Sequence, residues 1–154
     1  MTPRVKDAVG LVLRLVLGGV LIVAGWLKLD DLSGSRAATR AYRLMPTGVA
    51  DLVGTMLPFV EVTLGALLVL GLLTRGSALL GGLLMIAFVA GIASAWARGL
   101  SIDCGCFGGG GQVGVDQTAY LQEIVRDAAL ALAAAWLVVR PRTPASLDRR
   151  LWGT

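Results

Sequence analysis

Four long apolar segments dominate the sequence and restrict what the chain can fold into. They cover about residues 10–29, 52–73, 77–97 and 120–139. Each is close to the roughly 20 residues that an α-helix needs to cross a membrane, and none alternates as a barrel strand would. Because lipid offers the backbone no hydrogen-bond partners, spanning segments of this kind fold as helices. The sequence therefore predicts an all-α membrane protein, a four-helix transmembrane bundle.

A soluble bundle and a cleaved signal peptide are the two alternatives. Helices of a soluble bundle carry polar stripes along one face, and these segments lack them. Arg4 and Lys6 precede the first segment as in a signal peptide. That segment is too long for a signal-peptide core, however, and it ends in Trp26-Leu27-Lys28 without a clear small-residue cleavage site. We expect it to be retained, and residues 1–154 to form a single domain.

The charges between the segments predict the orientation in the membrane. With four spans, both termini and the turn at 74–76 share one side, while the loops at about 30–51 and 98–119 share the other. The first side carries a net charge of +5, from Arg4, Lys6, Arg75, Arg140, Arg142, Arg149 and Arg150 against Asp7 and Asp148. The second side is neutral, with Lys28, Arg36, Arg40, Arg43 and Arg98 against Asp30, Asp31, Asp51, Asp103 and Asp116.

Basic residues favour the cytoplasmic side of a membrane, above all directly at the end of a span. We therefore expect a multi-pass protein of the inner or plasma membrane with both termini in the cytoplasm. The loops at 30–51 and 98–119 are then extracytoplasmic. The basic tail fits contact with anionic lipid, and no basic-aromatic pattern typical of nucleic-acid binding is present. The lipid bilayer is the expected partner, and nucleic acid is not.

The chain contains no histidine and two cysteines. Its own residues therefore supply no Ser-His-Asp triad, no histidine-ligated haem or zinc and no imidazole acid–base step. Both cysteines lie in one predicted extracytoplasmic loop, as Asp103-Cys104-Gly105-Cys106-Phe107, followed by four glycines at 108–111. Disulfides form and persist outside the cytoplasm. The two cysteines are thus the first candidates for chemistry.

A Cys-x-Cys pair closes a very small ring, so its disulfide gains little from chain entropy, and glycine at its centre relieves crowding. Small disulfides tend to be labile or catalytic. The four glycines indicate a loop free to meet a partner thiol. We interpret Cys104 and Cys106, with Asp103 beside them, as a thiol–disulfide exchange site. A static disulfide, two unpaired thiols and a Cu(I) site remain alternatives. We do not predict a zinc site, because two thiolates alone bind zinc poorly. Our prediction is a site without a metal.

Several ionisable residues lie inside the apolar segments, where they are costly and usually functional. Glu61 lies near the middle of the second segment, and its candidate partners by depth are Arg14 and Arg126. In the fourth segment Glu123, Arg126 and Asp127 share one helix face. We expect Arg14, Glu61, Glu123, Arg126 and Asp127 to form a polar cluster below the cysteine loop. We interpret this cluster in two ways. It is either an ion pair that fixes helix packing, or a site at which Glu61, Glu123 or Asp103 handles protons.

The helix patterns and the cysteine loop resemble a known family. The first segment, from Arg14-x3-Gly18 to Ala24-Gly25-x2-Lys28-Leu29, and the second, from Pro58-x2-Glu61-x3-Gly65 to Thr74-Arg75, resemble DoxX-type membrane proteins. The loop Asp103-Cys104-Gly105-Cys106-Phe107-Gly108 is similar to that of the MauE branch, the methylamine-utilisation group. The resemblance implies a four-helix inner-membrane protein associated with extracytoplasmic disulfide formation. It also implies that Cys104 and Cys106 are the redox pair, with Arg14, Lys28, Glu61 and Arg75 at motif positions.

The sequence thus predicts an integral membrane protein that takes part in thiol–disulfide exchange outside the cytoplasm. If it is an enzyme, it is a thiol–disulfide oxidoreductase. The expected partner is a thioredoxin-like or disulfide-containing protein, and the resemblance points to maturation of a partner as in methylamine metabolism. A quinone is the candidate electron acceptor. The alternatives are an assembly subunit with a structural loop disulfide and a DoxD-like subunit of a quinone-linked oxidoreductase.

Overall fold

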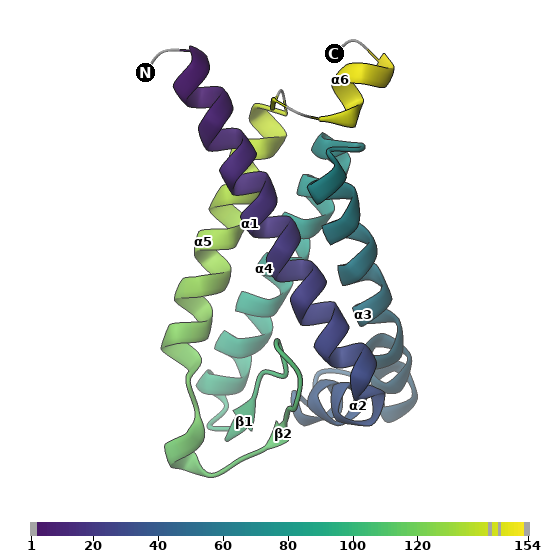
Figure 1. Ribbon diagram of the computed structural model, residues 1–154. Coiled ribbons are helices and arrows are strands. Elements are labelled where there is room, and N and C mark those ends of the chain that lie inside the picture. The colour runs from purple at the N-terminus through teal and green to yellow at the C-terminus, as the bar shows by residue number, and fades with distance from the viewer. Residues whose placement is uncertain (1–2, 142, 145, 153–154) are drawn as a thin grey trace.

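A computed structural model describes residues 3–141, 143–144 and 146–152 of the chain (Figure 1). Its helices are α1 (Pro3–Asp30), α2 (Leu32–Ala41), α3 (Thr47–Leu70), α4 (Thr74–Ala97), α5 (Tyr120–Val139) and α6 (Leu147–Trp152). Two short strands, β1 (Ile102–Asp103) and β2 (Gly111–Gln112), and a 3-10 turn, η1 (Val115–Gln117), lie between α4 and α5. Arg142, one basis of the predicted orientation, lies outside the described residues, as do the side chains of Arg149 and Arg150.

The four long helices run along one another, and the shorter elements close the two ends of the bundle. Figure 1 shows α6 near the start of α1 at one end, and α2, β1 and β2 together at the other. Leu17, Leu68, Met85 and Leu137 belong to the buried core between the four long helices. The cysteine loop, which β1 and β2 flank, therefore lies at the end of the bundle opposite to α6.

Three of the helices are long and apolar enough to cross a membrane: α1 over Arg4–Asp30, α3 and α4. The protein is therefore mostly helical, with at least three candidate spans among the described residues. Helix α5 has 20 residues, but Glu123, Arg126 and Asp127 lie in its first half and lower its apolar character. A fourth crossing by α5 stays a prediction.

Helices α1 and α3 approach closely through glycines. A methyl group added at Gly18 would lie 2.9 Å from the carbonyl oxygen of Gly65, and one added at Gly25 would lie 2.8 Å from that of Pro58. Small residues of this kind let helix backbones meet in lipid, where van der Waals packing replaces the hydrophobic effect. These contacts fix the position of α1 relative to α3 along their axes, because Gly18 meets Gly65 and Gly25 meets Pro58.

Helix α2 occupies the segment expected to be a loop at about 30–51. Asp31 caps its first turn, since its carboxylate accepts the Gly34 N–H at 2.9 Å. The buried face of α2 consists of Ser35, Ala38 and Ala41. The low hydropathy of this segment concealed the helix, because the buried residues are small and do not form an apolar run.

One hydrogen bond joins α2 to a backbone carbonyl of α3 that has no helical donor. Pro58 lies inside α3 and has no N–H, so the carbonyl of Gly54, four residues earlier, loses its helical donor. The Ser35 hydroxyl donates to that carbonyl oxygen at 2.6 Å. Gly54 allows the approach, because a methyl group there would lie 2.8 Å from the Arg36 Cα. The proline thus creates the site to which α2 binds.

At the other end, α6 holds the turn between α3 and α4. The Asp148 carboxylate accepts the N–H groups of Leu73 and Thr74, each at 2.8 Å, at the start of α4. Burial alone would raise the pKa of Asp148, but these two N–H groups, the Thr74 side chain and the charge of Arg14 together lower the pKa below its usual value. Asp148 serves as the N-cap that Leu73 itself does not provide.

The role of Ser35 is tested by a double-mutant cycle. Ser35→Ala leaves the Gly54 carbonyl buried without its donor, so we expect a loss of roughly 1–3 kcal/mol in the free energy of unfolding. In a Pro58→Ala background the helical N–H returns, and Ser35→Ala is expected to cost much less. Thermal unfolding of the four proteins in detergent micelles measures the difference. An equal cost of Ser35→Ala in both backgrounds would contradict the proposed link.

Candidate functional site

The cysteine loop is a tight hairpin. Ile102 pairs with Gln112 and Asp103 with Gly111 in an antiparallel register. Between them the structure joins the Sγ atoms of Cys104 and Cys106 in a disulfide, with the Cα atoms 5.3 Å apart. Cys104 is partly buried and Cys106 is buried, with 6% of its surface exposed. Cys104 is thus the more accessible of the two.

Glycines let this loop lie directly on α2. Gly105 and Gly110 both face the Ala38 Cβ, and a methyl group added at Gly105 would lie 2.5 Å from it. Both have a positive φ, as have the other glycines of the run at 108–111. Such backbone angles favour glycine. In the structure these glycines give a compact backbone close to α2, and the expected mobility of the loop stays a prediction.

Two tyrosines hold the hairpin in place. The Tyr42 hydroxyl, just after α2, donates to the Cys104 carbonyl oxygen at 3.2 Å. Burial, followed by the nearby carboxylates of Glu123, Asp127 and Asp103, raises the pKa of Tyr42 above its usual value, so the hydroxyl stays protonated. Tyr120, the first residue of α5, accepts the Ile102 N–H at 3.0 Å and donates to the Leu100 carbonyl. The loop is thereby tied to α2 and α5.

Carboxylates and a backbone N–H surround Cys104. Its Sγ and carboxylate oxygens of Asp103 and Glu123 all lie within 4.8 Å of one another. The Asp103 carboxylate also accepts the Gly105 N–H at 3.0 Å, so it shapes the turn. The Cys106 N–H points at the Cys104 Sγ from 3.1 Å. After reduction, this N–H would favour a thiolate on Cys104, whereas the two carboxylates would oppose it and could take up its proton.

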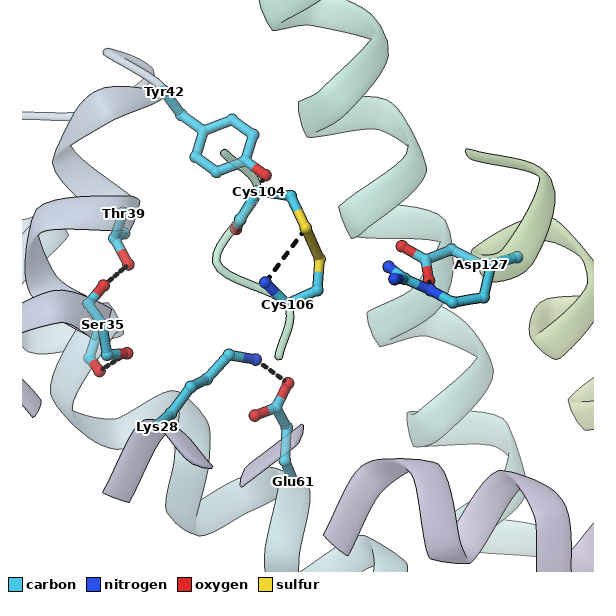
Figure 2. A network of polar contacts seen from close by, with 10 residues as sticks. Lys28, Ser35, Thr39, Tyr42, Glu61, Cys104, Cys106 and Asp127 are labelled. Atoms are coloured by element: carbon cyan, nitrogen blue, oxygen red, sulfur yellow. Dashed lines mark hydrogen bonds and ion pairs between the residues drawn. A yellow bond between two sulfur atoms is a disulfide. The ribbon is translucent and has the colours of Figure 1, made fainter. Parts of the chain in front are cut away.

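A buried ion pair lies beneath the loop. The Lys28 Nζ donates to the Glu61 Oε1 at 2.6 Å, with 4% of the lysine side chain and none of the glutamate exposed. The Lys28 Nζ also lies 5.2 Å from the centre of the Phe88 ring. Figure 2 shows this pair on one side of the disulfide and Tyr42 on the other.

The predicted partners of Glu61, Arg14 and Arg126, were therefore wrong. The first turns of α3 pack on α2 through Gly54 rather than on α1. The end of α1 consequently lies level with Pro58, and Gly25 contacts Pro58 and Glu61. Lys28, one turn beyond Gly25, then reaches Glu61. The depth count missed this because Lys28, at the end of the first segment, was counted with the loop charges and was not considered as a partner of Glu61.

The other charged residues divide between the two ends of the bundle. Arg126 pairs with Asp127 at 2.8 Å, and its guanidinium lies 4.7 Å from the centre of the Phe107 ring in the cysteine loop. Glu61, Asp127 and Arg126 share a small cavity with Cys106, so these three form part of the expected cluster. Arg14 instead donates to the Thr143 hydroxyl at 2.7 Å, on the side of α6. It belongs to a different part of the molecule.

Sequence reasoning from charge and spacing missed several residues of the site. Lys28 appeared only as a motif position of the family resemblance, and Tyr42, Phe88 and Tyr120 did not appear as site residues. The capping residue Asp31 followed by small residues is the signal that could have revealed α2. The aromatic residues carried no comparable signal, because their contacts depend on how the loop folds back.

The comparisons with known proteins agree with this picture. The family model described as methylamine utilisation protein MauE matches residues 6–140. The curated methylamine utilization protein MauE of Paracoccus denitrificans is 32% identical over 124 residues, which make up 80% of this chain and 66% of the relative. The match thus spans slightly less than two thirds of that relative. No solved structure gives a significant match.

The buried pair is tested by removing one partner and then both. Lys28→Met leaves the Glu61 carboxylate buried without its cation, so we expect a loss of roughly 3–5 kcal/mol in the free energy of unfolding. Lys28→Met with Glu61→Leu should recover most of that loss. Arg40→Met, which breaks the exposed pair with Asp51, is the matched control and should cost less than about 1 kcal/mol.

Thermal unfolding in detergent micelles measures these differences. If Lys28→Met costs no more than Arg40→Met, the pair is not the buried lock that the structure indicates.

Proposed function

Since this chain belongs to the MauE family of methylamine utilisation proteins, we propose that it is a multi-pass membrane protein that performs thiol–disulfide exchange at Cys104 and Cys106. The observation that carries the proposal is the disulfide itself, in a glycine-rich hairpin at one end of a helical bundle. As its partner we propose a thioredoxin-like or disulfide-containing protein of methylamine utilisation, the process that the relative's name gives.

The proposed orientation puts the cysteine loop outside the cytoplasm. Helix α5 is the fourth span, and the end with α6 and the first residues of α1 is cytoplasmic. Two features support this arrangement. Seven Lys and Arg residues belong to the termini and the α3–α4 turn, against five on the side of the cysteine loop, a modest excess in the direction of the positive-inside rule. A disulfide also persists on the oxidising side of a membrane.

The surroundings of Cys104 suit it to be the sulfur that meets the partner. It is more accessible than Cys106, and the Cys106 N–H stabilises a thiolate on it. A partner thiolate attacks the Cys104 Sγ, the bond to Cys106 breaks, and a mixed disulfide forms. The second thiol of the partner then attacks its own sulfur in that mixed disulfide and releases Cys104. Two electrons and two protons pass from the partner to the cysteine pair.

A structural disulfide in an assembly subunit is the second candidate. The observation in its favour is the close packing of Gly105 and Gly110 on Ala38, which holds the loop against α2. In that case the disulfide would stabilise a docking surface, and it would neither oxidise a partner thiol nor pass through a mixed disulfide. Its response to thiols therefore separates the two functions.

Exchange is tested on purified protein with a synthetic two-cysteine peptide. We expect the wild-type disulfide to oxidise about one reduced peptide per protein, since the electrons of one dithiol fill one disulfide. Cys106→Ser should form a mixed disulfide with the oxidised peptide, and the matched variant Cys104→Ser should do so far less, because Cys106 is buried. No peptide oxidation, with the pair resistant to mild reduction, would favour the structural disulfide.

The orientation is tested in the same proteins in membranes. After mild reduction, a membrane-impermeant maleimide should label Cys104 in right-side-out vesicles. Labelling from the cytoplasmic face alone would overturn the proposed orientation.

The position of Glu123 predicts the titration of the Cys104 thiol. A carboxylate beside a thiol opposes the thiolate, so Glu123→Gln should lower the pKa of Cys104. The pH dependence of alkylation of reduced Cys106→Ser protein, with and without Glu123→Gln, measures that change as a shift to lower pH. Asp116→Asn, at an exposed acidic residue of η1, is the control and should leave the profile in place. A profile that Glu123→Gln does not move contradicts the placement of this carboxylate.

A further inference from the structure

A cavity of about 200 Å³ adjoins the disulfide. Cys104, Gly105 and Cys106 line it on one side, and residues of α2, α3 and α4 form the remainder of its wall. Its lining is mainly apolar and includes Val53 of α3 and Ala87 of α4, which are exposed on the outer surface of two candidate spans. In a membrane protein, exposed apolar residues at the edge of a cavity connect it with lipid. A ligand that reaches this cavity through them must dissolve in lipid.

The lining includes four polar side chains, of which Ser35 and Thr39 donate to backbone carbonyls. The other two, Lys28 and Tyr42, flank the disulfide. The Lys28 ammonium has three N–H donors, of which its bond to Glu61 uses one. The Tyr42 hydroxyl lies next to Cys104 on the opposite side of the disulfide. A mainly apolar pocket with a few convergent polar groups is the usual form of a small-molecule site. The two groups suit a flat ligand with polar atoms at its ends.

We propose that this cavity binds the head group of a lipid-soluble quinone, which reoxidises the reduced Cys104–Cys106 pair. The proposal rests on the exchange function proposed above. Size permits it, because a cavity of about 150 Å³ already holds benzene in another protein, and this one is larger. Placement permits it too, because both cysteines belong to the wall.

Electron balance requires an acceptor outside the chain, and a quinone can serve as one. The chain has two cysteines, so a dithiol formed by exchange has no second pair within the chain to which its electrons can pass. A quinone takes two electrons and two protons and becomes a quinol. In the step, the two S–H bonds break, the S–S bond forms, and both electrons and both protons go to the quinone oxygens. Lys28 beside one oxygen stabilises the negative charge that develops there before protonation.

Two other occupants would explain fewer features of the cavity. A lipid acyl chain would fill apolar space but would gain nothing from a buried ammonium and a phenol. An apolar side chain of the partner protein has the same shortcoming, and it would enter from the aqueous face rather than past Val53 and Ala87. A quinone uses the apolar wall, the polar groups and the neighbouring sulfurs together.

The experiment compares two cavities of the same bundle. Ala87 is an exposed alanine at the wall of the proposed site, and Ala135 is an exposed alanine at a similar cavity between α4 and α5. Purified protein in liposomes receives a reduced two-cysteine peptide and decylubiquinone, and the loss of quinone absorbance is followed. We expect wild type and Ala135→Phe to reduce the quinone. Ala87→Phe, which overfills the site, should be slower by about tenfold or more.

Binding without electron transfer is measured separately. In a Cys104→Ser, Cys106→Ser protein no electrons can move, so quenching of tryptophan fluorescence by decylubiquinone reports binding alone. We expect saturable binding, and adding Ala87→Phe should weaken it by about tenfold. Adding Ala135→Phe should not.

Three results would overturn the quinone site. Equal slowing by Ala87→Phe and Ala135→Phe would place the quinone elsewhere, and a co-purified lipid that the quinone does not displace would identify an acyl chain as the occupant. Wild type that oxidises one equivalent of peptide but never reduces quinone would end this inference while leaving the proposed exchange function intact. If wild type oxidises no peptide, the exchange function fails, and saturable, Ala87-dependent binding still reports on the cavity.

Discussion

The buried contact between Lys28 and Glu61 joins the end of α1 to the middle of α3, and the cysteine end of the molecule is built around it. Two charges removed from solvent are tolerable when they meet at 2.6 Å, and a single one would be costly. The pair therefore locks the arrangement in which α1 and α3 already meet through Gly18, Gly25 and Gly65. Beyond that level α3 continues without α1, and α2 covers its exposed first turns. The hairpin then lies on α2.

In the same region, a side chain of α2 replaces a hydrogen-bond donor that is missing from α3. Pro58 removes a backbone donor from α3, and the Ser35 hydroxyl replaces it. Helix α2 packs closely on α3 at Gly54 and on the hairpin at Gly105 and Gly110, because glycine has no side chain at these contacts. The result is a compact end on the bundle in which the disulfide is held between Tyr42 and the ion pair (Figure 2). A disulfide held in this way leaves Cys104 less covered than Cys106, which is what the proposed exchange requires.

The helical class and the position of the cysteines could be read from the chain, because apolar segments near 20 residues and a Cys-x-Cys spacing are local signals. The ion pair could not, because it depends on the relative level of two helices. Gly18, Gly25 and Gly65 set that level, and a depth count for each span taken separately ignores it. Helix α2 was missed for a related reason, since its buried face is made of small residues that gain their role only against α3 and the hairpin.

The proposed exchange requires that the disulfide between Cys104 and Cys106 be a working redox pair. Its reduction potential tests this most directly, measured by equilibrating the purified protein with glutathione buffers and counting alkylated thiols by mass spectrometry. Structural disulfides resist reduction down to potentials below about −300 mV. Because the pair closes a very short ring and one of its cysteines is accessible, we expect half-reduction well above that value. A pair that stays oxidised throughout the glutathione range would contradict the account.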